Sequence, residues 1–191
     1  RVRNIKKNSI EYSVDKKLID ILNKIYKKPK ITIVHSYKAQ KINLLVISGG
    51  NNIKIFSKKK NDLIRNKITL FHFKKNLKNK TPIIGICYGA QLIAHFFRSK
   101  LKKYQNHVGN HSVTLKNSKF NKNLKKNNVV NSYHDYAITN LGSHLSTLAV
   151  AKDNTIEAFK HKKLKILGIM WHPERYEKIK KIDIEYFKRI K

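Results

Sequence analysis

The sequence predicts an α/β fold in which a mostly parallel central sheet continues into an antiparallel extension. In the first half of the chain, short apolar strands alternate with amphipathic helices, whereas the second half consists mainly of short strands. Alternation is typical of parallel sheets, and successive strands are typical of antiparallel ones. The sequence has no linker rich in Ser, Pro or Gly and no internal repeat, so residues 1–191 are expected to form a single domain.

Two helices of the first half are predicted from apolar residues that recur every three or four positions. The first begins near Ser13 and Asp15, and the second covers residues 60–78. Their apolar positions are Val14, Leu18, Ile21, Leu22 and Ile25 in the first helix and Leu63, Ile64, Ile68, Phe71 and Leu77 in the second. Each helix is therefore expected to bury that side.

Three apolar runs of the first half predict strands over residues 31–34, 43–47 and 82–86. The run at 43–47 is typical of a strand buried on both faces of a parallel sheet, and it leads into a turn with the sequence Ser-Gly-Gly-Asn-Asn. The run at 82–86 leads abruptly into an apolar helix over 92–97. In the second half, strands are expected over residues 108–115, 129–132, 147–151, 155–161 and 166–171, and a last helix from about Glu177 to the end.

Charge is the most conspicuous feature of the composition. Lys and Arg number 43 against 11 Asp and Glu, a net charge of +32, which first suggests a polyanionic partner. Lys, Ile and Asn are all abundant and all have AT-rich codons, so base composition explains much of this charge. The lysine pairs are also scattered, whereas a nucleic-acid site more often gathers them with interleaved aromatic residues. A solvated basic surface is the favoured interpretation.

Several protein classes are excluded by composition. Apolar residues make up 40% of the chain, which argues against a disordered basic tail. A single cysteine excludes an internal disulfide framework and favours a reducing compartment. No apolar run approaches the ~18 residues of a membrane span, and the start carries no signal-peptide pattern. We therefore expect a cytoplasmic protein without membrane association.

Residues 85–89, Gly-Ile-Cys-Tyr-Gly, are the most informative segment for chemistry. A buried strand that ends in this pattern and passes into a helix is typical of a nucleophile elbow, with Cys87 as the nucleophile. Gly85 and Gly89 suit the tight turn, where side chains would collide. The helix N-terminus offers N–H groups for an oxyanion and is expected to lower the pKa of the Cys87 thiol. Outside such a context, a free cysteine is usually a small buried apolar residue.

Residues 171–174, Trp-His-Pro-Glu, contain a base and an acid for such a thiol. In an extended backbone His172 and Glu174 point to the same side, so Glu174 can hold the imidazole in one tautomer and stabilise its charged form. Pro173 restricts the backbone between them. Alone, this segment would be an ordinary surface turn. With a cysteine elbow far upstream, it predicts a catalytic triad.

Three blocks of sequence resemble motifs of the class I glutamine amidotransferase superfamily, and they occur along the chain in the same order as in that superfamily. They are Ser-Gly-Gly-Asn at 48–51, Gly-Ile-Cys-Tyr-Gly-Ala-Gln at 85–91 and Trp-His-Pro-Glu-Arg at 171–175. Asn-Ser-Tyr-His at 131–134 and Asp-Asn-Thr-Ile-Glu-Ala at 153–158 are similar to its γ-glutamyl hydrolase-like branch, the peptidase C26 type. Within that branch, the motifs Ser-Gly-Gly-Asn and Met-Trp-His-Pro-Glu-Arg most resemble those of enzymes that hydrolyse γ-glutamyl-CDP-amidate.

The resemblance implies a three-layer, flavodoxin-like class I glutamine amidotransferase fold. It implies Cys87 as nucleophile, His172 as general acid and base, and Glu174 as its orienting acid. The backbone N–H groups of Gly50 and Tyr88 would form the oxyanion hole. The remaining residues of the γ-glutamyl pocket would be Gly49, Gln91, Ser132, Tyr133 and His134. The Gly-Gly pair also fits a turn where backbone approaches a ligand closely.

Some positions depart from the family pattern. Tyr88 stands where many relatives have Arg, and Asn52 stands where Asp is common. These differences affect which substrate is expected, whereas the three triad residues match the family pattern. The family also begins with a strand that would precede Arg1, so we expect that N-terminal sequence is missing here.

The expected function is cysteine-dependent hydrolysis of a γ-glutamyl amide, which releases glutamate and ammonia or an amine. No cofactor or metal is expected: His107 and His111 have helical ligand spacing, but their surroundings predict a strand and no cluster of thiolates or carboxylates accompanies them. If glutamine is the substrate, a synthetase subunit should receive the ammonia; a γ-glutamyl conjugate needs no partner. The alternative is a basic nucleic-acid or anion-binding protein on an inactive amidotransferase scaffold.

Overall fold

The computed structural model of the chain describes residues 2–6, 9–104 and 108–190. The strands are β1 (Val2–Lys6), β2 (Ser9–Tyr12), β3 (Leu45–Ile47), β4 (Ile83–Ile86), β5 (Lys100–Lys103), β6 (Val108–Leu115), β7 (Asn127–Tyr133), β8 (Tyr136–Asn140), β9 (Leu145–Ala151), β10 (Ile156–His161) and β11 (Ile166–Ile169). The helices are α1 (Lys16–Tyr26), α2 (Lys60–Lys78), α3 (Tyr88–Phe96), α4 (Ser118–Asn121) and α5 (Lys181–Lys188), with 3-10 turns η1 (Lys54–Phe56) and η2 (Pro173–Arg175).

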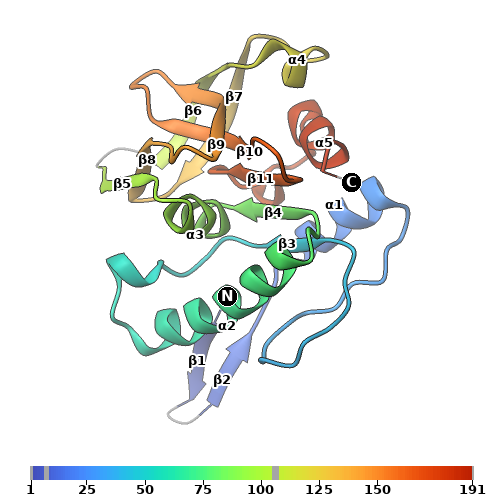
Figure 1. Cartoon of the computed structure of the whole chain (residues 1–191), viewed down its shortest axis with the longest axis vertical. Coiled ribbons are helices and arrows are strands. Elements are labelled where there is room, and N and C mark those ends of the chain that lie inside the picture. Colours follow the sequence, from blue (N-terminus) through green and yellow to red (C-terminus); the bar gives the residue numbers. More distant parts are fainter. Residues whose placement is uncertain (1, 7–8, 105–107, 191) are drawn as a thin grey trace.

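A nine-stranded sheet, counted over the described residues, runs through the molecule (Figure 1). Its main order is β3-β4-β11-β10-β9-β6-β7, and β8 and β5 branch from β10. The strands β3, β4 and β11 are parallel, whereas β10, β9, β6 and β7 continue the sheet with antiparallel pairings. The predicted parallel centre with an antiparallel extension is confirmed, and the extension contains more strands than the parallel centre.

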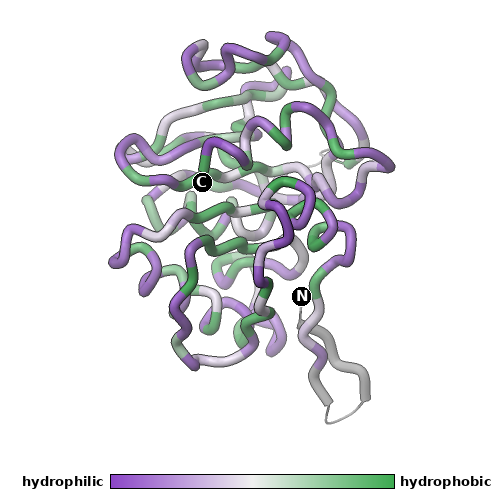
Figure 2. The backbone as a smooth tube through the Cα atoms, turned by 90° about the vertical axis from the view of Figure 1, so that its right-hand side faces the viewer, coloured by the Kyte–Doolittle hydropathy of each residue, from purple (hydrophilic) through white to green (hydrophobic). Residues whose placement is uncertain are grey.

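The parallel strands lie between two layers of helices, because alternate residues of each strand face opposite sides (Figure 1). In β4, Ile84 and Ile86 pack with α1 and α5, while Ile83 packs with α2 and α3. In Figure 2 the hydrophobic stretches of the backbone gather in the interior, and hydrophilic stretches form much of the outer loops. This burial on both faces is what the continuously apolar strands predicted.

The first two predicted helices form with nearly the predicted bounds. The helix α1 begins where predicted, since the Asp15 side chain caps it by accepting a hydrogen bond from the Lys17 N–H at 2.9 Å. The last helix begins later than predicted, at Lys181, because buried Asp183 accepts a hydrogen bond from the Lys180 N–H and fixes the N-terminus there.

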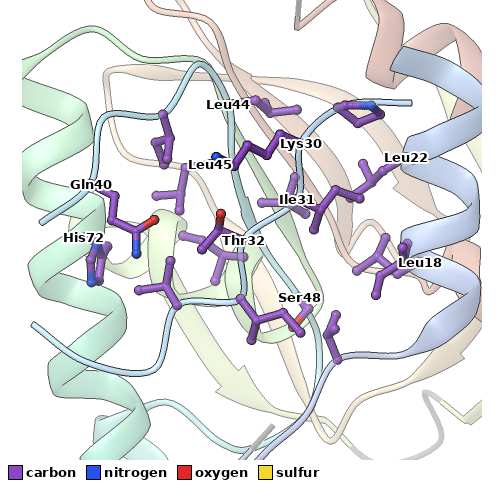
Figure 3. Close-up of a pocket in the computed structure, with 18 of the residues that line it drawn as sticks. Leu18, Leu22, Lys30, Ile31, Thr32, Gln40, Leu44, Leu45, Ser48 and His72 are labelled. Atoms are coloured by element: carbon purple, nitrogen blue, oxygen red, sulfur yellow. The ribbon is translucent and has the colours of Figure 1, made fainter. Parts of the chain in front are cut away.

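The predicted strand over residues 31–34 is wrong, because no strand among the described residues pairs with this segment. In the described part of the chain β3 pairs only with β4, and a cavity of about 730 Å³ lies beside it. Figure 3 shows Leu18 and Leu22 of α1 on one side of this cavity and His72 of α2 on the other. The hairpin β1–β2 and the strands β5 and β8 were not predicted; β5 is mostly lysine and mostly exposed, so it lacks the apolar alternation of a strand.

Among the residues that the structure describes, no helix combines the length and the apolar character needed to cross a membrane.

Candidate active site

The carboxyl ends of the three parallel strands bring the predicted blocks together. The strands β3, β4 and β11 end at Ile47, Ile86 and Ile169, and they are neighbours in register. Because parallel strands end at the same edge of a sheet, the segments that follow them meet there. These segments are the Ser-Gly-Gly turn, Cys87 and His172, so the sheet assembles blocks far apart in sequence at one edge (Figure 1).

Cys87 lies at the junction of β4 and α3, in a strained backbone conformation with φ 48° and ψ −101°. Its N–H donates to the Ile169 carbonyl at 2.8 Å, and its carbonyl accepts from the Gln91 N–H at 2.9 Å. The first bond continues the pairing with β11, and the second begins α3. The residue therefore turns the chain from strand to helix within a single position, as in a nucleophile elbow.

The two glycines that flank the elbow are required by close contacts. A Cβ added to Gly85 would lie 2.6 Å from the backbone carbon of Gly89, and a Cβ added to Gly89 would lie 2.2 Å from the Ile47 carbonyl oxygen. Both distances are well below van der Waals contact. The prediction that side chains here would collide is confirmed.

The predicted lowering of the Cys87 pKa is wrong for the protein without substrate. Burial, with a smaller contribution from the charge of Glu174, raises the pKa of this thiol to about 12. The Tyr88 N–H and the charges of Arg175 and Arg65 act in the opposite direction but do not outweigh burial. Cys87 is therefore a protonated thiol at neutral pH, and a base must remove its proton when it reacts.

His172 is held next to Glu174 just beyond the end of β11. The Nδ1 atom of His172 lies 2.7 Å from Oε1 of Glu174, and both side chains are buried. A carboxylate at this distance favours the proton on Nδ1, which leaves Nε2 as an acceptor. The Asn131 side chain fixes the backbone of His172 with two hydrogen bonds, of 2.8 Å from the His172 N–H and 2.9 Å to its carbonyl.

The Gly49–Gly50 turn lies against the His172 imidazole. A Cβ added to Gly49 would lie 2.3 Å from Cε1 of His172. Gly50 has a φ of 106°, a conformation that glycine adopts readily and other residues rarely do. The close neighbour of this turn in the structure is therefore the His172 imidazole, and its approach to a ligand stays a prediction.

The other predicted pocket residues lie on α3, on β7 and directly after β7. The Gln91 amide donates to the Tyr136 carbonyl at 3.0 Å, which joins α3 to the segment after β7. The half-exposed Tyr133 ring lies 5.8 Å from the His172 ring, edge to face. Ser132 and His134, on either side of it, are buried. The Nε2 atom of His134 lies 3.6 Å from Oε1 of Glu157.

Glu157 forms a separate buried cluster with two histidines. Its carboxylate oxygens lie 3.5 Å from Nε2 of His111 and 3.6 Å from Nε2 of His134. His107, the other histidine weighed as a metal ligand, lies outside the described residues. Within residues 2–6, 9–104 and 108–190, no group of three or more His, Cys, Asp or Glu side chains is arranged to hold a metal ion.

Arg65 was missed by the sequence analysis. Its guanidinium is buried and donates to the carbonyls of Ser48 and Gly49 at 2.6 and 2.9 Å. The helix α2 buries several polar side chains, whereas Phe71, expected on the buried side, is 37% exposed. The buried polar residues are Asp62, Arg65, Asn66, His72 and Asn76. Several of these side chains form hydrogen bonds with backbone groups of the irregular loops beside α2, which have no strand partners of their own.

The chain is similar to known proteins in sequence. The peptidase C26 family model matches residues 25–174. The gamma-glutamyl-CDP-amidate hydrolase of Campylobacter jejuni subsp. jejuni is 42% identical over 162 residues, which are 82% of this chain and 75% of that protein. The carbamoyl phosphate synthase small chain of Clostridium perfringens is 35% identical over 105 residues, which are 52% of this chain but 28% of that protein.

The fold is also that of solved amidotransferase structures. A glutamine amidotransferase from Thermotoga maritima superposes with a TM-score of 0.65 over 82% of this chain and 69% of that one, at 18% identity. The expected class I glutamine amidotransferase fold is thereby confirmed. Together with the family match over most of the sequence, these similarities show that the chain belongs to the peptidase C26 family.

Proposed function

We propose that this enzyme hydrolyses a γ-glutamyl amide through a thioester on Cys87. The observation that carries the proposal is the meeting of a strained cysteine elbow and a hydrogen-bonded His172–Glu174 pair at the ends of adjacent parallel strands. A nucleophile, a base and a group that orients the base are the parts that acyl transfer requires. The similarity to a gamma-glutamyl-CDP-amidate hydrolase over most of the chain supports the γ-glutamyl group as the acyl part.

The reaction begins with attack of the Cys87 sulfur on the γ-carbonyl carbon. Burial keeps this thiol protonated, so Nε2 of His172 takes the proton as the C–S bond forms. The N–H groups of Gly50 and Tyr88 stabilise the tetrahedral oxyanion. His172 then passes its proton to the departing nitrogen as the C–N bond breaks, which leaves a γ-glutamyl thioester. Water, deprotonated by the same imidazole, attacks the thioester carbon. The C–S bond then breaks, glutamate is released, and the imidazolium returns its proton to the Cys87 sulfur.

Glu174 acts on His172 throughout this cycle. Its hydrogen bond to Nδ1 keeps Nε2 available to accept a proton, and its charge stabilises the imidazolium that forms in each half-reaction. Asn131 holds the His172 backbone, so the imidazole has little freedom to leave this arrangement. The chemistry assigned to these residues needs neither a metal nor an organic cofactor.

The favoured substrate is a γ-glutamyl conjugate with an anionic leaving group. The relative that acts on gamma-glutamyl-CDP-amidate matches 82% of the chain, whereas the carbamoyl phosphate synthase small chain matches 52%. A net charge of +32 would also raise the local concentration of an anionic substrate. Hydrolysis of such a conjugate requires no ammonia-accepting synthetase. A reducing cytoplasm would suit the enzyme, because Cys87 must stay a thiol.

Glutamate release tests the proposal. Glutamine, γ-glutamyl-p-nitroanilide and a γ-glutamyl conjugate of a nucleotide are each incubated with the wild type and with Cys87→Ala. We expect release from at least the conjugate by the wild type, none by Cys87→Ala, and labelling of Cys87 by a glutamine-mimicking diazoketone. Absence of both turnover and labelling in a folded wild-type protein would contradict the proposal. Salt-sensitive nucleic-acid binding in their place would favour the binding-protein alternative.

A further inference from the structure

One buried arginine connects both proposed oxyanion donors. Nη2 of Arg65 donates to the Ser48 carbonyl at 2.6 Å, and Nη1 donates to the Gly49 carbonyl at 2.9 Å and to Oδ1 of Asn51 at 3.0 Å. The turn that contains Gly50 is irregular, so its carbonyls have no strand partner to hold them. A single planar guanidinium holds two successive carbonyls of this turn.

This contact fixes the direction of the Gly50 N–H. The peptide unit between Gly49 and Gly50 is planar and trans, so its C=O and N–H point in opposite directions. Because the Gly49 carbonyl points at Arg65, the Gly50 N–H points away from it. A rotation of this peptide would turn the N–H round and break the 2.9 Å hydrogen bond. Gly50, with its φ of 106°, would not resist such a rotation sterically, so the restraint must come from Arg65.

Arg65 also contacts Tyr88, whose backbone N–H is the second proposed oxyanion donor. The carbon of the Arg65 guanidinium lies 4.0 Å from the centre of the Tyr88 ring, which is fully buried. Stacking of this kind favours the cation–π attraction and a fixed relative position. Tyr88 is the residue after Cys87, and its own N–H is the other proposed donor. Arg65 therefore spans from the Gly-Gly turn to the elbow.

Arg65 is itself held from a second side. Oδ1 of Asn51 accepts its hydrogen bond, and Nδ2 of Asn51 donates to Asp62, one turn earlier in α2, at 2.8 Å. The guanidinium is thus fixed by the helix, the turn and an aromatic ring together. A side chain held this firmly can hold its partners firmly, which is the condition for preorganised donors.

We propose that Arg65 is a positioning residue that preorganises the oxyanion hole by holding the Gly49–Gly50 peptide and the Tyr88 ring in one arrangement. This inference rests on the proposed γ-glutamyl hydrolysis. It predicts that Arg65 contributes to kcat and not to substrate affinity, because an oxyanion exists only along the reaction path.

The test is the Arg65→Lys variant, with γ-glutamyl-p-nitroanilide as substrate. Lysine keeps the positive charge but lacks the planar fork that binds two carbonyls. We expect kcat to fall by about 10- to 100-fold, less than the ~10²–10³-fold loss on removal of an oxyanion donor. KM should change by less than roughly threefold. The pH dependence of Cys87 alkylation by iodoacetamide, which needs no oxyanion hole, should stay as in the wild type.

Arg189→Lys is the matched control. The Arg189 guanidinium also lies over an aromatic ring (Phe120, 5.2 Å), and it pairs with Glu185 at the C-terminal end of α5, remote in the fold from the Gly-Gly turn. Its variant should keep the wild-type kcat. Circular dichroism and the melting temperature confirm that both variants are folded.

The outcomes separate the two proposals. If the wild type is active and Arg65→Lys keeps the wild-type kcat, or changes only KM, the positioning role is overturned and the proposed function stands. Arg65 then contributes through its positive charge or through the stability of the fold. A changed pH profile of alkylation in Arg65→Lys would likewise assign it to the electrostatics of Cys87. A folded wild type that releases no p-nitroaniline, with Cys87 unlabelled, overturns the proposed function and this inference with it.

Discussion

Gly49 lies in direct contact with the His172 imidazole, so close that a Cβ on Gly49 would be 2.3 Å from Cε1 and 3.0 Å from Nδ1 of His172. The glycine is therefore needed for the position of the proposed base. Gly49→Ala should push the imidazole away from Glu174 and lower kcat/KM by at least about 10²-fold. It should also cost about 1–3 kcal/mol of unfolding free energy, as overpacking does. Glutamate release and urea unfolding measure the two effects.

A double variant tests whether the imidazole is the cause. In a His172→Ala background the added methyl group has room, so Gly49→Ala should cost much less stability there than in the wild type. An equal cost in both backgrounds would mean that backbone strain, and not the contact with His172, explains the effect.

The pKa of Cys87 leads to a second prediction. Because burial raises that pKa to about 12, the thiolate fraction at neutral pH is small and rises about tenfold per pH unit up to that value. Alkylation of the free enzyme by iodoacetamide should therefore accelerate about tenfold per unit between roughly pH 7 and pH 10. A rate measured by mass spectrometry that levels off near neutral pH would contradict this. Cys87→Ala, which has no other cysteine to react, supplies the blank.

The parts of the site that the sequence predicts are those with local patterns. The glycines at 85 and 89 could be predicted because a tight strand-to-helix turn allows few residue types, and the contacts of Gly89 with Ile47 confirm the reason. The pairing of His172 with Glu174 was predicted from an extended backbone, which is wrong, because residues 173–175 form the 3-10 turn η2. The Glu174 carboxylate nevertheless lies 2.7 Å from Nδ1 of His172. Apolar periodicity located α1, which is amphipathic and buries Leu18, Ile21 and Leu22. It also gave the bounds of α2, but not its buried side, which is mostly polar.

Features that depend on tertiary partners were missed. Arg65 looks like a surface arginine in sequence, and only the loop packed beside α2 gives it its carbonyl partners. Residues 31–34 have strand-like composition, but a strand needs a neighbour and the cavity beside β3 separates them from one. The pKa of Cys87 depends on burial, which opposes the helix N-terminus and outweighs it. The contacts of Arg65, the pairing of residues 31–34 and the burial of Cys87 all depend on residues distant in sequence, so residue spacing alone does not predict them.

The hydrogen bond between Glu174 and His172 predicts a large loss in kcat for Glu174→Gln. The amide can still accept a hydrogen bond from Nδ1–H, but it carries no charge to stabilise the imidazolium. We expect kcat to fall by about 10²–10⁴-fold with a small change in KM. Glu185→Gln, at a half-buried position within α5, is the control and should keep full activity. Equal activity of Glu174→Gln and wild type would remove Glu174 from the triad.

The buried cluster of Glu157, His111 and His134 should make stability depend on pH. Burial would raise the pKa of Glu157, but its hydrogen bonds with His111 and His134 outweigh burial and lower that pKa from 4.5 to about 2. The hydrogen bond with Glu157 is also the main cause that raises the pKa of His111 above 6.5. The stabilisation from Glu157 is therefore present above pH 4.5 and lost as the pH falls toward about 2. The stabilisation from His111 is present below pH 6.5 and lost as the pH rises through its higher folded value.

Glu157→Gln should then reduce the free energy of unfolding most near about pH 5.5, by about 1–3 kcal/mol, and less at about pH 3 and about pH 8. Urea unfolding of both proteins at the three pH values measures this difference. Glu185→Gln breaks an ion pair that is only partly buried, so it should change stability by about 1 kcal/mol at most. A Glu157→Gln difference that is the same at all three pH values would contradict the lowered pKa of Glu157 and the raised pKa of His111, because a group makes stability depend on pH only where its pKa differs between the folded and unfolded states.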